Sequence, residues 1–143
     1  EEIQEIIAAI NAKFGTPDWQ PIHLFMENNY TQAIAGMRVY DVLLINAVID
    51  GMNLVAKEGP VVNIKDGVVI LSEAAGAYPQ LAEGVLPVSP ADIEGTMQAM
   101  YEALTMAPED RQERRSRLVE AIEREDINHW IKRQFEDLRS LAP

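Results

Sequence analysis

The alternation of short apolar runs with helical patterns limits most strongly what this chain can fold into. The apolar runs cover residues 22–26, 42–45, 68–71 and 85–88. The second and third runs are apolar on both faces, which is typical of parallel strands covered by helices on either side. Strands that alternate with helices form right-handed βαβ units. The pattern predicts an α/β fold: a three-layer Rossmann-like domain with a parallel sheet of about four strands.

Helical spacing or capping signals mark six stretches between and after these runs. We expect helices up to Phe14, at 33–40, from Asn53, from Ser89 to about Met106, from Pro108, and from Asp126 or Asn128. Gly59-Pro60 should stop or kink the third helix, because Pro60 has no amide for the helical ladder. The last three helices lie outside the strand–helix repeat. We therefore expect one partial domain over residues 1–143, with 108–143 as a helical C-terminal extension.

The composition excludes several classes of function. Acidic residues outnumber basic ones 23 to 12, which gives a formal charge of −11. Nucleic acid and anionic membranes attract basic surfaces, so neither is an expected partner. The chain has no cysteine, which rules out disulfides and fits a reducing compartment, so we expect a cytoplasmic protein. His23 and His129 have no acidic neighbour at metal-ligand spacing, so no metal is expected.

Candidate ligand positions follow from the predicted sheet. In open parallel sheets, ligands bind beyond the carboxyl ends of the strands. Three loops have this position, at residues 27–30, 46–53 and 72–77. The loop 46–53 is the most informative of them, because it leads from a strand directly into a helix. The charged stretch 109–117 is expected to be a solvated helix face with i,i+4 ion pairs.

The start of the helix after loop 46–53 favours an anion such as phosphate. Its first amides, near Asn53, Leu54 and Val55, have no acceptor inside the helix, and the helix dipole adds positive potential. Gly51 would let the backbone turn sharply and approach a ligand closely. Spacing alone favours a simpler interpretation, an ordinary strand-to-helix turn that Asn53 caps.

Two acidic side chains flank the same helix start. Glu58 lies one turn further along, on the same helical face, where a carboxylate can accept hydrogen bonds from sugar hydroxyls. Asp50, at the mouth of the loop, is placed to accept from the hydroxyls of a second sugar. In the simpler interpretation Glu58 is solvated.

Several motifs, taken in order, resemble one family. Asp50-Gly51-Met52-Asn53-Leu54-Val55-Ala56-Lys57-Glu58 resembles the signature of trehalose-6-phosphate synthases, retaining glycosyltransferases with two Rossmann-like domains. Similar segments lie on both sides of it, at residues 15–19, 21–22, 40–42, 71–77, 88–92, 103–106 and 126–130. The resemblance covers nearly the whole chain.

The resemblance implies a nucleotide-sugar donor site in the C-terminal half of a GT-B fold. Asp50 would bind hydroxyls of the donor sugar, and Glu58 would bind the ribose. The loop with Gly51 and the backbone amides of Met52, Asn53, Leu54 and Val55 would hold the sugar and the diphosphate. The implied reaction moves a glucosyl group from UDP- or GDP-glucose to a sugar phosphate, with retention and without a metal or other cofactor.

Three departures from the family pattern leave a second branch open. Ile49 stands where the family usually has Arg, and Gly59-Pro60 follows Glu58 where an aromatic residue is usual. The stretch 28–30 is also poor in basic residues. These departures indicate a side branch of the family, such as a pseudo-glycosyltransferase or a glucosylglycerol-phosphate synthase.

The acceptor-binding N-terminal domain of that family is not represented in the chain. We therefore expect the 143 residues alone to be inactive, since the sugar-phosphate acceptor would bind through that domain. Apolar surface that normally meets it would be exposed, so the isolated chain is expected to form homo-oligomers. The alternative from another class is a Rossmann-like binding or assembly module without catalysis.

Overall fold

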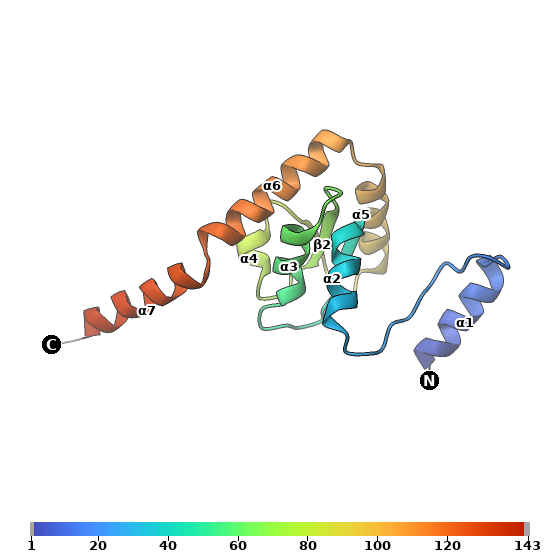
Figure 1. The fold of residues 1–143 in the computed structure, drawn as a ribbon, viewed down its shortest axis with the longest axis horizontal. Coiled ribbons are helices and arrows are strands. Elements are labelled where there is room, and N and C mark those ends of the chain that lie inside the picture. Colours follow the sequence, from blue (N-terminus) through green and yellow to red (C-terminus); the bar gives the residue numbers. More distant parts are fainter. Residues whose placement is uncertain (1, 142–143) are drawn as a thin grey trace.

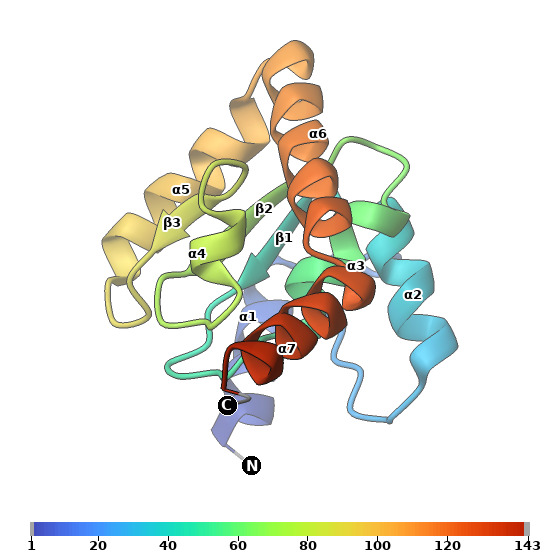
Figure 2. The same ribbon diagram turned by 90° about the vertical axis from the view of Figure 1, so that its left-hand side faces the viewer.

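The computed structural model describes residues 2–141 and has three layers in its central part (Figures 1 and 2). Three parallel strands form the sheet: β1 (Val42–Ile45), β2 (Val68–Ser72) and β3 (Leu86–Val88). The helices of the described part are α1 (Glu2–Phe14), α2 (Tyr30–Val39), α3 (Leu54–Val62), α4 (Tyr78–Leu81), α5 (Ile93–Thr105), α6 (Pro108–Arg124) and α7 (Ile127–Leu141). The Rossmann-like α/β architecture is confirmed.

The sheet has the strand order β1-β2-β3, with every neighbouring pair parallel. The central strand β2 is fully buried because both of its faces are covered. Val69 and Leu71 face a core built with α3, α4 and α6. Val68 and Ile70 face the other core, which α5 closes with its small residues Ala99 and Ala103. The alternation along one strand thus supplies both interfaces of the three layers.

The sheet has three strands rather than the expected four. Residues 22–26, predicted as a strand, have no strand assignment, because nothing in the described part of the chain pairs with their backbone. Asn11 instead holds the start of this segment against α1 through two hydrogen bonds with the backbone of Ile22, of 2.9 and 3.0 Å. The loop 27–30 consequently does not lie at the carboxyl end of a strand.

Two predicted helix boundaries were also wrong. The helix expected from Ser89 begins at Ile93, because the carboxylate of Asp92 caps it by accepting from the Gly95 amide at 2.9 Å. Helix α3 continues to Val62 through Pro60, which was expected to stop or kink it. Pro60 lies in the seventh position of this helix and is buried, so its ring contributes to the core.

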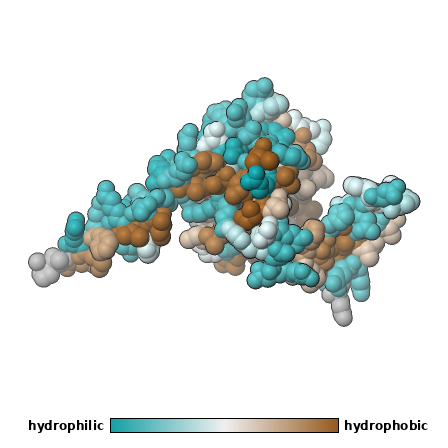
Figure 3. Space-filling model, in the orientation of Figure 1, coloured by the Kyte–Doolittle hydropathy of each residue, from teal (hydrophilic) through white to brown (hydrophobic). Residues whose placement is uncertain are grey.

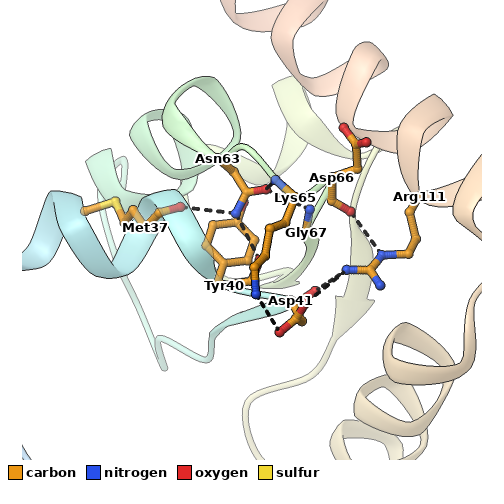
Figure 4. A network of polar contacts seen from close by, with 8 residues as sticks. All are labelled: Met37, Tyr40, Asp41, Asn63, Lys65, Asp66, Gly67 and Arg111. Carbon is orange, nitrogen blue, oxygen red and sulfur yellow. Dashed lines mark hydrogen bonds and ion pairs between the residues drawn. The ribbon is translucent and has the colours of Figure 1, made fainter.

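A buried side chain joins α2, α3 and the entry to β2 (Figure 4). Asn63 is 1% exposed, and its amide nitrogen donates to the carbonyls of Met37 and Tyr40 at 3.2 and 3.0 Å. Its amide oxygen accepts from the backbone amides of Lys65 and Gly67, both at 2.9 Å. Every polar atom of the side chain is therefore hydrogen-bonded, which is what burial of an amide requires.

Arginines of α6 hold this helix against the amino ends of the strands. Arg111 donates to the Asp41 carbonyl, just before β1, at 3.3 Å and to the Asp66 carbonyl, two residues before β2, at 3.1 Å. Arg114 donates to the Val85 carbonyl, which precedes β3, at 3.1 Å. The expected solvated face of 109–117 was thus only partly right. Its i,i+4 ion pair between Glu113 and Arg117 is present.

The two end helices lie apart from the three layers (Figure 1). Helix α1 is connected to the core by the long segment 15–29, and α7 projects away from the far end of α6. Neither has a buried residue. Apolar side chains gather along one side of α7, where Trp130 and Phe135 are 57% and 59% exposed (Figure 3).

Candidate functional site

The candidate site lies beyond the carboxyl ends of β1 and β2, where two of the predicted loops meet. Past the strands, the backbone of Asp50 forms a parallel bridge with Ala75. The Gly76 amide donates to the Asp50 carbonyl at 2.8 Å, and the Ala77 amide donates to the Met52 carbonyl at 2.8 Å. The loops 46–53 and 72–77 are therefore joined like a continuation of the sheet.

This pairing explains a glycine in the second loop. A side chain at Gly76 would collide with the backbone of Gly51, since its Cβ would overlap the Gly51 carbonyl oxygen. The bare stretch 72–77 thus permits one loop to pack directly on the other. Ser72, fully buried at the end of β2, fixes the turn by accepting from the Ala74 amide through its hydroxyl at 3.1 Å.

The turn into α3 is made by Asn53, which has φ 75°. Gly51 was expected to let the backbone turn sharply here, yet no glycine in the described part of the chain has a positive φ. Asn tolerates this region better than most residues because its short polar side chain bonds locally. Its amide oxygen accepts from the Ala56 amide at 3.0 Å, so Asn53 is the helix cap, as the simpler interpretation held.

The cap leaves part of the helix start open. Within residues 2–141, the structure gives the backbone amides of Leu54 and Val55 no hydrogen-bond acceptor. The amide of Met52, also predicted to hold the donor, donates to Asp50 Oδ1 at 3.1 Å in this structure. Two neighbouring donors at the positive end of a helix are a suitable arrangement for a phosphate oxygen.

Asp50 lies beside these amides and is held as a carboxylate. Its Oδ1 accepts from the Met52 amide, and its Oδ2 accepts from the Asn53 side-chain amide at 2.9 Å. These hydrogen bonds, led by that of the Met52 amide, keep the pKa of Asp50 below its usual value, because they stabilise the charged form. An ionised, oriented carboxylate can accept hydrogen bonds from hydroxyl groups but cannot donate any.

Gly51 and Glu58 complete the predicted set. A Cβ at Gly51 would meet no atom within 4 Å, so this backbone faces open space where a ligand can approach it. Glu58 lies in α3, one turn after the open amides, and is half-buried. The seven predicted residues run from the end of loop 46–53 into the second turn of α3.

The sequence offered the second loop, 72–77, as a ligand position, but it did not show that this loop pairs with the first. The backbones of Ala74 and Gly76 form one wall of the site by pairing with Asp50. In the sequence, a run of small residues after a buried strand indicated a tight turn here, but it did not indicate that loop 46–53 packs against this turn.

Residues 2–141 contain no group of three or more His, Asp or Glu side chains arranged to hold a metal ion. None of the helices in that range is long and apolar enough to cross a membrane.

Comparison with known proteins assigns the chain to a family. The model of Glycosyltransferase family 20 matches residues 1–140. The chain belongs to this family. The trehalose-6-phosphate synthase of Citrobacter koseri is 36% identical over 139 residues, which cover 94% of the chain and 29% of that protein. The glucosylglycerol-phosphate synthase of a Picosynechococcus species is 33% identical over 143 residues, which cover 99% of the chain and 28% of that protein.

Solved structures agree with the assignment to family 20. A structure described as "Trehalose-6-phosphate from E. coli bound with UDP-2-fluoro glucose" superposes with a TM-score of 0.89 at 33% identity, over 99% of this chain and 32% of that one. The structure of an α,α-trehalose-6-phosphate synthase from Burkholderia multivorans superposes with a TM-score of 0.88, over 99% of this chain and 30% of that one. The similar solved structures are GT-B trehalose-6-phosphate synthases, and the chain spans about a third of their length.

Proposed function

We propose that this chain forms the donor-binding part of a retaining glycosyltransferase that uses UDP- or GDP-glucose. The observation that carries the proposal is the pair of open amides at Leu54 and Val55, beside the oriented carboxylate of Asp50. The amides suit the diphosphate, whose charge grows as the sugar leaves, and preorganised donors of this kind stabilise such charge. Asp50 accepts from the hydroxyls of the glucosyl group, and Glu58 accepts from the ribose.

Donor binding in this proposal uses no metal ion or other cofactor. Backbone amides and a helix dipole neutralise the diphosphate in place of a cation. Calorimetry with UDP-glucose should therefore give the same affinity with and without EDTA. A binding heat that appears only with a divalent cation would contradict this part of the proposal.

The sharpest test of the donor site uses Gly51→Ala. The added methyl group meets no protein atom within 4 Å and the backbone there needs no positive φ, so the fold should be unaffected. A donor in contact with this backbone would collide with the methyl group. We expect affinity for UDP- and GDP-glucose to fall at least roughly tenfold, since one steric clash costs a kcal/mol or more.

Gly36→Ala is the matched control, because Gly36 in α2 also faces open space. Calorimetry on both variants should show lost binding for Gly51→Ala alone. Glu58→Ala should weaken UDP-glucose, while leaving glucose 1-phosphate, which has no ribose, unchanged. Equal binding by Gly51→Ala and the unmodified chain would refute the site.

In the complete reaction the glucosyl group passes to a sugar phosphate that an N-terminal domain holds. Similar proteins are long enough to contain such a domain, because this chain covers only 29% and 32% of two of them. The 143 residues alone should then release no UDP from UDP-glucose in the presence of glucose 6-phosphate. Turnover by the isolated chain would contradict this.

Similarity to a glucosylglycerol-phosphate synthase favours glycerol 3-phosphate as a second candidate acceptor. The glucosylglycerol-phosphate synthase relative matches 99% of the chain at 33% identity, close to the values for trehalose-6-phosphate synthases. A family-length protein that contains this chain, assayed with glycerol 3-phosphate and with glucose 6-phosphate, would separate the two. The non-catalytic assembly module predicts neither donor binding nor turnover.

A further inference from the structure

The face of α3 that packs on the sheet carries only compact side chains. Its buried positions are Ala56, Gly59 and Pro60. They follow one another at helical spacing, so they form one stripe of the helix. Because none of them has a long side chain, the backbone of α3 can lie close to β1.

Gly59 lies at the contact between α3 and β1. A Cβ at this position would be 2.6 Å from Cδ2 of Leu43, which is in β1. It would also be 3.6 Å from the ring and from the hydroxyl of Tyr40, two residues before β1. The first distance is shorter than two carbon atoms tolerate, so α3 can keep its present place only with glycine here or with a displaced Leu43.

Tyr40 is held on its other side by a second glycine. A Cβ at Gly67, at the entry to β2, would overlap the opposite edge of the Tyr40 ring (Figure 4). The ring therefore lies between the backbones of Gly59 and Gly67, and its hydroxyl is buried. An aromatic ring enclosed in this way cannot move aside, so a large side chain at position 59 would push α3 away from the sheet.

The start of α3 is fixed separately, by the loops of the donor site. Asn53, which caps the helix, donates through its side-chain amide to Asp50 Oδ2 at 2.9 Å. Asp50 in turn is joined to Ala75 of the second loop. The first turn of α3 is thus placed by the loops 46–53 and 72–77, and not by the packing of Gly59.

Glu58 lies beyond this fixed start, directly before Gly59 in the second turn of α3. It is half-buried. Since the helix start is held at Asn53, the packing of Gly59 sets how far the second turn lies from β1. The position of the Glu58 carboxylate follows from that distance.

We propose that Gly59 is a positioning residue for the nucleotide-sugar donor. By allowing α3 to pack directly on Leu43 and Tyr40, it holds the Glu58 carboxylate within reach of the ribose. Gly59 itself is buried and acts only through Glu58. A displacement of about 1 Å is enough to weaken a contact that depends on fixed geometry. The inference rests on the proposed function, because the ribose contact is part of that function.

The experiment is calorimetry on Gly59→Leu in the full 143-residue chain. A leucine is too large for a rotation of the Leu43 side chain to accommodate, so α3 must shift. We expect UDP-glucose to bind roughly tenfold more weakly, which is the effect of losing a hydrogen bond to a charged group. Glucose 1-phosphate, which has no ribose, should bind as before.

Two double variants test whether the effect passes through Glu58. Adding Leu43→Ala to Gly59→Leu makes room for the new side chain, so it should restore most of the affinity for UDP-glucose. Adding Gly59→Leu to Glu58→Ala should weaken UDP-glucose no further than Glu58→Ala alone, because the contact is already absent. General damage to the fold would instead add to the effect of Glu58→Ala.

Gly84→Ala is the matched control for packing. Its Cβ would overlap Leu118 of α6, a helix that contributes nothing to the donor site. It should lower the stability to urea and leave UDP-glucose binding unchanged. Urea denaturation also establishes that each variant is folded in the binding buffer. If Gly59→Leu does not fold, Gly59→Ala replaces it, since alanine favours the helix and should give a smaller loss in the same direction.

Three outcomes would overturn this inference alone. They are an unchanged UDP-glucose affinity in folded Gly59→Leu, an equal loss for UDP-glucose and glucose 1-phosphate, and a further loss when Gly59→Leu is added to Glu58→Ala. Failure of the unmodified chain to bind UDP-glucose would instead overturn the proposed donor site, and this inference with it.

Discussion

Among single residues, Asn63 connects the most segments through one side chain. Replacing it with alanine removes four hydrogen bonds and leaves two carbonyls and two amides without these partners in a buried region. We expect Asn63→Ala to lower the free energy of unfolding by about 3 kcal/mol. Urea denaturation measures this. The control is Asn46→Ala, which removes one exposed 3.4 Å hydrogen bond and should cost less than about 0.5 kcal/mol.

Tyr40 lies beside Asn63, but its side-chain polar atom forms no hydrogen bond. Its hydroxyl is buried and has no hydrogen-bond partner among the described residues. Burial also raises the pKa of the phenol well above its usual value, so the group stays neutral. Tyr40→Phe removes a polar atom that forms no bond, so we expect unchanged or higher stability, by up to about 1 kcal/mol. A clear loss of stability in urea denaturation would show that the hydroxyl is hydrogen-bonded in solution.

At the scale of elements, α6 is attached by charged side chains as well as by its apolar face. Arg115 donates to the Pro60 carbonyl at 3.1 Å and to the carboxylate of Asp66 at 3.3 Å. We expect Arg115→Ala to lower the free energy of unfolding by about 1 kcal/mol, because both groups are only partly buried. Arg124→Ala is the control, since among residues 2–141 Arg124 makes an exposed ion pair with Glu125 and no other ion pair or side-chain hydrogen bond. Equal effects of the two substitutions in thermal unfolding would contradict the role of Arg115.

The start of helix α7 is capped by Asp126, a residue whose carboxyl group titrates. Asp126 accepts from the His129 amide at 2.8 Å, and this bond is the main reason why the pKa of Asp126 is lowered. The lowered pKa means that the cap stabilises the helix above the usual carboxyl pKa of 3.8 and loses this effect as the pH falls through the lower value. The NMR signal of the His129 amide should report the loss. Asp126→Asn caps about equally well but does not titrate, so it should remove the pH dependence.

The strands and helices differ in how far they could be predicted from the sequence. β1 and β2 were predicted because their residues are apolar on both faces, a property of each strand by itself. Segment 22–26 has similar residues, but pairing depends on a neighbour that its own sequence does not specify. The arginines of α6 were interpreted as solvated because the carbonyls that they contact belong to residues 29 to 70 positions away in the sequence.

For the candidate site, the sequence placed residues 50–55 at a strand-to-helix turn and Glu58 one turn into the helix, and the structure has the same helix start at Leu54. The residue with a positive φ in this turn is Asn53 rather than a glycine, and its side chain bonds Asp50 and the Ala56 amide. The pairing with loop 72–77 could not be predicted. It depends on the register of two parallel strands, which brings Gly76 onto the backbone of Gly51.

At the scale of the whole molecule, the uncovered apolar faces should make the isolated chain associate. The exposed side chains of α5 and α7 include Tyr101, 72% exposed, and Trp130, 57% exposed. Light scattering should give an average mass that rises with protein concentration, since such faces are removed from water on contact. Tyr101→Lys combined with Trp130→Lys should lower that mass, and Ile64→Lys should not. A constant monomer mass for the unmodified chain would contradict the expectation.

Arginines of α6 contact the amino ends of the strands, whereas residues 50–53 follow the carboxyl end of β1. Because the chain contains no cysteine, a single thiol introduced at the exposed Glu109 would be the only one to react with a maleimide. A surface or a fluorophore coupled there would sit at the far end from residues 50–58. Immobilised molecules would then present residues 50–58 to the solution in one uniform orientation.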